Sequence, residues 1–294
     1  MAEPVRKKVP VAGDELEVFI GGRDEPGAGT VCTAHPTEPL DGSLTLLADI
    51  TRARVVCVNP RGVGRSSPPQ RASDLSLEVT AGDLDAVRRS LGLHRWTIWG
   101  MSGGSMIAQV YARRYSEALD GLILDSAGPS FAVTLRDTGC IASPYFPSWR
   151  KALAAAGLAP QPEDQPEGEG SIETAPSEMT WEEVSNVGWV LRGGRAGRVI
   201  LVAPSPPSPQ MRRAMPYLLA FDARPWLGDI RVPTLVLGGA DDQVVPPAYL
   251  RAVQEAIPGS SLVLIGGAGH VPVFEKPDEV AAAVRHFLSQ RVWL

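Results

Sequence analysis

A serine between closely spaced glycines is the feature of this chain best suited to chemistry. It lies in the run Gly100-Met101-Ser102-Gly103-Gly104, between the apolar segment 96–99 and the segment 105–115, which has helical spacing. A serine in the pattern Gly-x-Ser-x-Gly, placed between a strand and a helix, occupies a sharp turn that exposes its hydroxyl. The start of the following helix offers free N–H groups and a partial positive charge, which stabilise an oxyanion. The pattern therefore predicts that Ser102 is a nucleophile.

A serine nucleophile needs a base, because its hydroxyl barely ionises near neutral pH. Of the four histidines, His94 precedes a strand and His286 lies in the last predicted helix, so we expect both to be surface or packing residues. His35 ends an apolar strand, where we expect it to line the site or support an oxyanion loop. His270 lies in the glycine-rich segment 266–272, after the last predicted strand, at the edge where active sites of parallel sheets collect. We predict that His270 is the base.

Three aspartates could orient the imidazole and stabilise its charged form. Asp241 and Asp242 follow the predicted strand that ends at Gly238-Gly239, and Asp125 directly follows the strand 122–124. All three come after strands that end at the same predicted edge as Ser102. Asp242 is the preferred acid, with Asp241 and Asp125 as alternatives.

The remaining site residues are predicted from their neighbours. The N–H of Gly103, which follows the nucleophile, is the expected first donor of an oxyanion hole. Thr37 is the expected second donor, because Pro36 in the loop after the strand 30–34 has no N–H. His35, Met101 and Trp189 are predicted to contact the substrate.

Strand and helix signals alternate along most of the chain, which predicts a mostly parallel central sheet flanked by helices. The alternation stops after Gly128-Pro129 and resumes near Ile230. Between them lie helix-like pieces and an acidic, proline-rich loop at 161–170. We therefore expect a core domain of residues 1–130 and 230–294, with an inserted, mostly helical lid at 131–229.

Composition narrows the classes of partner. The 294 residues are 44% hydrophobic, enough for a sizeable core, and carry a net charge of −5, which disfavours nucleic acid and anionic membranes. The N-terminal segment has no apolar signal core, no apolar run reaches membrane-spanning length, and three cysteines (Cys32, Cys57 and Cys140) have no metal-like spacing. We expect a cytoplasmic protein with a small-molecule substrate and with no cofactor, metal, nucleic acid or membrane partner.

Several stretches are similar to lid-containing members of the α/β-hydrolase fold superfamily, nearest the prolyl iminopeptidase-like and esterase branches. They are Asn59-Pro60-Arg61-Gly62-Val63-Gly64-Arg65-Ser66, the Ser102 motif, 233–246 and Gly269-His270. The chain order Ser, Asp, His is also that of this superfamily. The resemblance implies an acid three residues after a glycine and four before a proline, which selects Asp242 within 239–246.

One stretch departs from the family pattern. His35-Pro36-Thr37-Glu38-Pro39 replaces the His-Gly start of the family's oxyanion loop, which disfavours an aminopeptidase. Such a peptidase would also need carboxylates for the substrate ammonium group, for which Glu182 and Glu183 are candidates.

The resemblance implies a serine hydrolase acting on an ester, lactone or thioester of a small organic molecule through an acyl-enzyme on Ser102. The alternatives use the same three residues for aminopeptidase, carbon–carbon hydrolase, lyase or acyltransferase chemistry. A non-catalytic ligand-binding protein is a third possibility. Outside the site, Arg61 is expected to hold neighbouring loops together.

Overall fold

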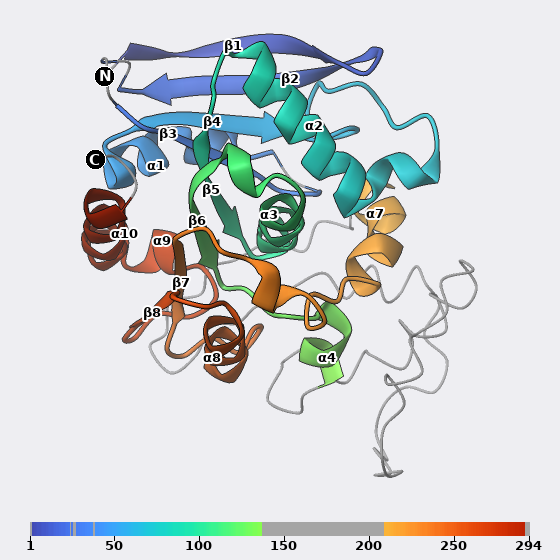
Figure 1. Cartoon of the computed structure of the whole chain (residues 1–294). Coiled ribbons are helices and arrows are strands. Elements are labelled where there is room, and N and C mark those ends of the chain that lie inside the picture. The colour runs from blue at the N-terminus through green and yellow to red at the C-terminus, as the bar shows by residue number, and fades with distance from the viewer. Residues whose placement is uncertain (1, 24, 26–27, 38, 137–208, 292–294) are drawn as a thin grey trace.

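The computed structural model describes residues 2–23, 25, 28–37, 39–136 and 209–291 (Figure 1). Among these residues the strands form one eight-stranded sheet in the order β1-β2-β4-β3-β5-β6-β7-β8. β2 is antiparallel to β1 and to β4, whereas the other neighbouring pairs are parallel. The strand bounds are β1 Ala2–Val11, β2 Asp14–Gly22, β3 Thr30–Ala34, β4 Arg54–Asn59, β5 Trp96–Met101, β6 Leu119–Asp125, β7 Thr234–Gly239 and β8 Ser261–Ile265.

Helices cover both faces of this sheet (Figure 1). α1 packs beside α10 on one face, and α2 packs beside α3 on the other. The bounds of the described α-helices are α1 Leu44–Thr51, α2 Leu77–Ser90, α3 Gly103–Arg114, α4 Phe131–Arg136, α7 Pro209–Leu219, α8 Pro247–Ala256, α9 Pro272–Glu275 and α10 Pro277–Arg291. The predicted fold class, a mostly parallel sheet flanked by helices, is confirmed.

The central strand β4 shows why the sheet is buried on both sides. Val56 and Val58 pack into the core beneath α2 and α3, whereas Val55 and Cys57 pack into the core beneath α1 and α10. Successive side chains of a strand point to opposite faces, so a continuous apolar run suits a strand between two helical layers. The apolar run 55–58 fits this arrangement.

The N-terminal hairpin turns at Ala12-Gly13, where φ is 47° and 87°. Two successive positive φ values are typical of the turn whose twist matches a two-residue hairpin, and Asp14 is thereby free to begin β2.

The insertion lies between two neighbouring strands, because β6 pairs directly with β7 although more than a hundred residues separate them. Within the predicted lid 131–229, the structure describes α4 and the segment from α7 onward; residues 137–208 lie outside the described residues. The domain division therefore stays a prediction.

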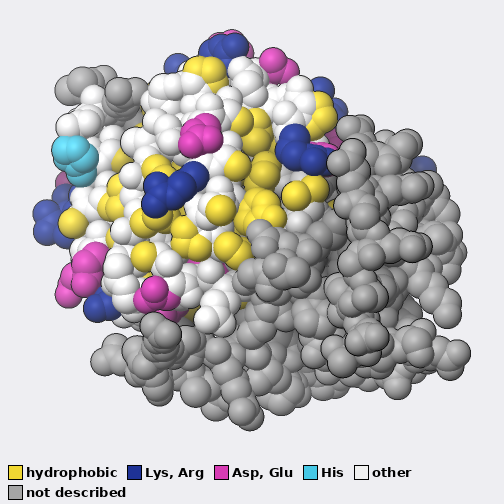
Figure 2. All heavy atoms as spheres, turned by 90° about the horizontal axis from the view of Figure 1, so that it is seen from below, with side chains coloured by type: hydrophobic (Ala, Val, Ile, Leu, Met, Phe, Trp, Pro, Cys, Tyr) yellow, Lys and Arg dark blue, Asp and Glu magenta, His cyan; other side chains and the backbone are white. Residues whose placement is uncertain are grey.

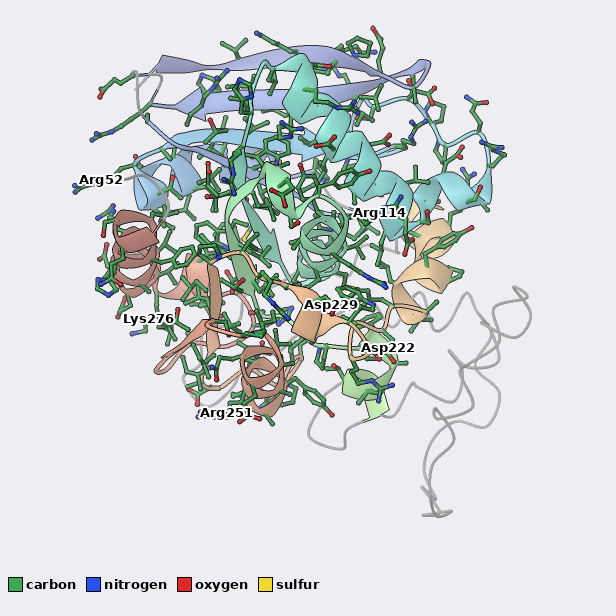
Figure 3. All side chains as sticks on the ribbon, viewed as in Figure 1. Arg52, Arg114, Asp222, Asp229, Arg251 and Lys276 are labelled. Carbon is green, nitrogen blue, oxygen red and sulfur yellow. The ribbon has the colours of Figure 1, made fainter. Side chains whose placement is uncertain are left out.

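The surface of the described part is mixed in character. Charged side chains such as Arg52 and Arg251 lie at the outside of the ribbon (Figure 3). Seen from below, hydrophobic side chains gather near the middle of the described surface (Figure 2), a common feature of folded proteins that by itself identifies no ligand. Within the part of the chain that the structure describes, no helix has the length and apolar character needed to cross a membrane.

Candidate active site

Ser102 lies at the sharp junction between β5 and α3. β5 ends at Met101, α3 begins at Gly103, and Ser102 between them has φ of 49° and ψ of −118°. A positive φ is costly for a residue with a side chain, and a strained turn of this kind is what projects a serine hydroxyl from the backbone. A Cβ at Gly100 would overlap the start of α3, and one at Gly104 would overlap the Ala34 carbonyl oxygen. The neighbouring glycines therefore let strand and helix approach closely enough to form the junction.

His270 and Ser102 are in direct contact. The imidazole Nε2 lies 2.8 Å from Ser102 Oγ, although 168 residues separate them in the chain. His270 is located in the loop between β8 and α9, at the same sheet edge as Ser102. This geometry lets the ring accept the proton of the serine hydroxyl.

Asp242 completes a hydrogen-bonded chain with these two residues. Its Oδ2 lies 2.9 Å from His270 Nδ1, and its Oδ1 accepts the N–H groups of Val244 and Val245 at 2.8 and 3.0 Å. The carboxylate is buried, so backbone donors fix its orientation and compensate for lost water. Asp241, the adjacent alternative, is exposed instead.

The backbone on both sides of His270 is held by a residue that the sequence analysis missed. Glu275 of α9 accepts the N–H of Gly269 through Oε2 at 2.8 Å and that of Val271 through Oε1 at 3.1 Å. Hydrogen bonds to a carboxylate are stronger than those between neutral groups. A glutamate five residues after a candidate histidine base was the available signal.

Asp125, the third candidate acid, lies beside this chain of residues and does not bond the imidazole ring in the way that Asp242 does. It is buried, and its Oδ2 accepts the indole N–H of Trp99 at 3.4 Å. Burial raises the pKa of Asp125 to about 7, although the Trp99 hydrogen bond and the nearby charge of His270 act in the opposite direction. The structure thus brings a second carboxyl group close to the Ser102 site.

The expected oxyanion residues also lie near one another. Gly103 occupies the first position of α3, where backbone N–H groups have no intrahelical partner. A Cβ at Gly103 would lie 3.0 Å from His35 Nε2, so the His35 loop packs directly against the start of this helix. The N–H of Thr37 is directed at His35 Nδ1 over a long 3.4 Å.

His35 is expected to remain uncharged around neutral pH. Burial, together with the nearby charge of His270, lowers the pKa of His35 to about 4. Its ring contacts Thr37 through Nδ1, with Oγ1 at 3.3 Å. Of the other predicted substrate contacts, Met101 is half-buried next to Ser102, whereas Trp189 lies outside the described residues.

Arg61 forms ion pairs away from the Ser102 site. Buried Arg61 donates to Asp83 through two nitrogens, at 2.7 and 3.0 Å, and also bonds Asp14. It thus joins the start of β2 to α2, rather than two loops as expected, and its role in this part of the fold is structural. Over the described ranges, no group of three or more His, Cys, Asp or Glu side chains is arranged to hold a metal ion.

Comparison with known proteins identifies a matching family model and similar sequences. The family model described as "alpha/beta hydrolase fold" matches residues 42–167 and 194–277. A proline iminopeptidase from Lactobacillus helveticus is 27% identical over 252 residues, which is 83% of each chain.

Two solved structures show the same fold at low identity. An alpha/beta fold family hydrolase from Bacillus anthracis str. Sterne superposes with a TM-score of 0.73 at 21% identity and covers 98% of this chain and 100% of that chain. An enol-lactonase from Burkholderia xenovorans LB400 superposes with a TM-score of 0.64 at 21% identity and covers 97% of this chain and 100% of that one.

Proposed function

Because the chain belongs to the alpha/beta hydrolase fold family, we propose that it is a serine hydrolase that cleaves an ester, lactone or thioester of a small organic molecule. The observation that carries the proposal is the continuous chain of hydrogen bonds from buried Asp242 through His270 to Ser102. A binding protein has no need of a histidine aligned on a serine hydroxyl, whereas covalent catalysis by serine requires a base in this position.

The proposed reaction has two stages. His270 takes the proton of Ser102 as Oγ attacks the substrate carbonyl, and then gives it to the leaving group. The product of this stage is an acyl-enzyme on Ser102. Water activated by His270 then attacks the acyl carbon, releases the acid and restores the serine. Asp242 holds the ring with its Nδ1 proton inward and stabilises the imidazolium that forms at each stage.

Two backbone donors are proposed to stabilise the oxyanion of each tetrahedral intermediate. The first is the N–H of Gly103, supported by its position at the positive end of α3. The second is the N–H of Thr37, whose contact with the His35 ring is long and is made to an uncharged acceptor. A negatively charged oxygen is a stronger acceptor and would displace that contact.

The inserted segment 131–229 is proposed to contribute to the substrate site. His35 and Met101 are proposed contacts on the core side, and Trp189 is proposed on the lid side. The insertion would then determine substrate specificity, while residues of the core carry out the reaction. Such a division is common in proteins that share one fold and differ in function.

Aminopeptidase activity is the second candidate, because the Lactobacillus helveticus relative is a proline iminopeptidase and matches most of this chain. The same three residues could cleave an N-terminal peptide bond. In that case Glu182 and Glu183 of the insertion are the proposed partners of the substrate ammonium group. The stretch 35–39 lacks the family's His-Gly, which favours hydrolysis of an ester, lactone or thioester over aminopeptidase activity.

The first experiment is labelling with a fluorophosphonate, which reacts with activated serines, followed by peptide mass spectrometry. We expect an adduct on Ser102 in the wild type, none in Ser102→Ala, and an unchanged adduct in Ser116→Ala, a serine outside the site. A folded wild type that stays unlabelled would contradict the proposal.

A substrate panel then separates the two candidates. Short acyl esters, lactones and thioesters are compared with an N-terminal prolyl anilide under the same conditions. Turnover of the esters alone supports the first candidate, and turnover of the anilide that depends on Glu182 or Glu183 replaces it with the second.

A further inference from the structure

Asp125, the last residue of β6, and Ser126, which follows it, connect the segments that carry Ser102, Asp242 and His270. The N–H of Ser102 donates to the Asp125 carbonyl at 2.9 Å, and the N–H of Ser126 donates to the carbonyl of Leu237 in β7 at 2.8 Å. The hydroxyl of Ser126 donates to the backbone carbonyl of His270 at 2.8 Å. The nucleophile, the strand that leads to Asp242 and the histidine loop are therefore tied to one dipeptide.

The backbone of Ser126 is held in an unusual conformation that permits these contacts. Its φ is 51°, in the left-handed region that residues with a side chain rarely adopt, and the residue is buried. Such strain persists only where surrounding contacts compensate for it, and it concentrates at functional sites. Here the compensating contacts are the hydrogen bonds to Leu237 and His270.

The hydrogen bonds around Ser126 can be assigned by counting protons. Its Oγ lies 2.8 Å from the His270 carbonyl oxygen and 3.2 Å from Asp125 Oδ1. A carbonyl oxygen only accepts, and a serine hydroxyl has one proton to donate. When that proton goes to His270, the contact with Asp125 is a hydrogen bond only if the carboxyl group carries a proton and donates it.

Burial of Asp125 favours this protonated form. It raises the pKa of the carboxyl group to about 7, although hydrogen bonds from Trp99 and Ser126 to the ionised form and the nearby charge of His270 act in the opposite direction. The titratable groups that face it are His270 from the loop after β8 and Asp242 from the loop after β7, and the uncharged indole N–H of Trp99 donates to Oδ2. A second carboxylate beside Asp242 is disfavoured by repulsion, so the proton on Asp125 also limits charge in the site.

We propose that Asp125 and Ser126 are positioning residues for the proposed hydrolase. The carboxylic acid of Asp125 donates to Ser126 Oγ, and Ser126 donates to the carbonyl of His270, so that this bridge holds the imidazole in line with Ser102. The inference rests on the proposed function. In this inference Asp125 contacts no substrate. Its neutral carboxylic acid acts through Ser126 on the backbone carbonyl of His270.

Ionisation of Asp125 would weaken the bridge. An ionised carboxylate only accepts, so it would compete with the His270 carbonyl for the single proton of Ser126. The bridge is therefore complete below about pH 7 and lost progressively as the pH rises through that value. Misplacement of a catalytic group by about 1 Å is enough to cost roughly 10²-fold in rate.

The test measures the rate constant of fluorophosphonate labelling at Ser102, which needs no substrate. We expect Ser126→Gly to label up to about 10²-fold more slowly than the wild type, with a similar loss in Ser126→Ala. Glycine is comfortable at positive φ, so a loss in Ser126→Gly reports on the hydroxyl rather than on folding. Ser130→Ala, a buried serine in the same connection without contact to His270, is the matched control. Equal rates in Ser126→Gly and wild type would overturn the proposal.

The second variant is Asp125→Asn, whose amide can donate to Ser126 and accept from Trp99 as the protonated acid does, but cannot ionise. We expect its labelling rate to match the wild type near pH 6 and to exceed it several-fold at pH 8 to 9. Parallel pH profiles for the two proteins would contradict a protonated Asp125.

A measurement independent of labelling separates the two levels of inference. In protein with ¹³C-labelled aspartate, the carboxyl resonance that Asp125→Asn removes should titrate near pH 7. Titration of that resonance near pH 4 would overturn the bridge even when Ser102 labels normally. Titration near pH 7 in a protein that does not label would contradict the proposed hydrolase function but support a protonated Asp125.

Discussion

Asp242 differs from its neighbour Asp241 in what surrounds the carboxylate rather than in chemistry. Two backbone N–H groups and one imidazole N–H converge on Asp242, whereas Asp241 is exposed. These donors aim one carboxylate oxygen at the ring and leave it no other orientation. At the scale of the single residue, position within a tight turn therefore separates an orienting acid from a solvated one.

We predict that Asp242→Asn lowers turnover or labelling at Ser102 by about 10⁴-fold, the loss in kcat known for the corresponding substitution in a serine protease. The amide N–H would face Nδ1, so the ring proton would move to Nε2, which could then no longer accept the proton of Ser102. The variant should bind substrate nearly normally, so kcat falls far more than KM rises.

Asp241→Asn is the matched control and should stay within about twofold of wild type, because exposed substitutions have small effects. A larger loss in Asp241→Asn than in Asp242→Asn would contradict the prediction that Asp242 orients His270.

At the scale of the element, the short helix α9 acts as a clamp on the histidine loop. Glu275 receives N–H groups from both sides of His270, and Ser126 holds the carbonyl of the same residue. The loop contains three glycines, Gly266, Gly267 and Gly269, which would otherwise leave it many conformations. A side chain of α9 and the side chain of the residue that follows β6 therefore supply the order that the loop sequence lacks.

We predict that Glu275→Gln destabilises the fold by about 1–2 kcal/mol, because the amide keeps one acceptor oxygen and replaces the other with a donor that faces an N–H group. Labelling at Ser102 should slow at the same time. Urea unfolding and labelling rates measured on the same preparations test both effects.

Glu279→Gln, at an exposed position in α10, provides the comparison and should change neither quantity appreciably. Full stability together with wild-type labelling in Glu275→Gln would mean that α9 does not clamp the loop.

At the scale of the whole molecule, folding buries two titratable groups, and burial shifts their pKa values in opposite directions. The pKa of His35 is lowered to about 4, so its ring is neutral near pH 7, and the pKa of Asp125 is raised to about 7, so its carboxyl group holds its proton at lower pH. The unfolded chain would ionise each near its ordinary value, about 6.5 for histidine and 3.9 for aspartate. Neutral histidine loses its contribution to stability as the pH falls below about 6.5, and protonated aspartate loses its own as the pH rises above about 4.

We predict that Asp125→Asn gains stability relative to the wild type as the pH rises from 5 to 7. The folded wild type holds a proton there that the unfolded chain has released, so its unfolding free energy falls with pH. One proton limits this slope to about 1.4 kcal/mol per pH unit. Urea unfolding at several pH values measures it.

Asp49→Asn, which changes an exposed aspartate, should run parallel to the wild type over the same range. A constant difference between Asp125→Asn and wild type across pH 5 to 7 would show that Asp125 is already ionised in the folded protein.

The sequence alone determined the features that depend on neighbours along the chain. The Ser102 turn is local, since glycines on either side permit the strand and helix to meet. The apolar run 55–58 predicts a strand buried on both faces, and the alternation of elements predicts the sheet. His270 could be selected because it follows the last strand in a glycine-rich loop. Asp242 was preferred over Asp241 and Asp125 from its place after a strand, and the family resemblance selected the same residue.

Only the tertiary structure decided the contacts that depend on segments far apart in the chain. The bond from Ser126 to His270 crosses 144 residues, and no periodicity or turn pattern encodes it. The protonation of Asp125 depends on burial and on charges brought in by two other loops. Hydrogen-bond partners and pKa values are properties of the three-dimensional neighbourhood, which forms only when the strands assemble.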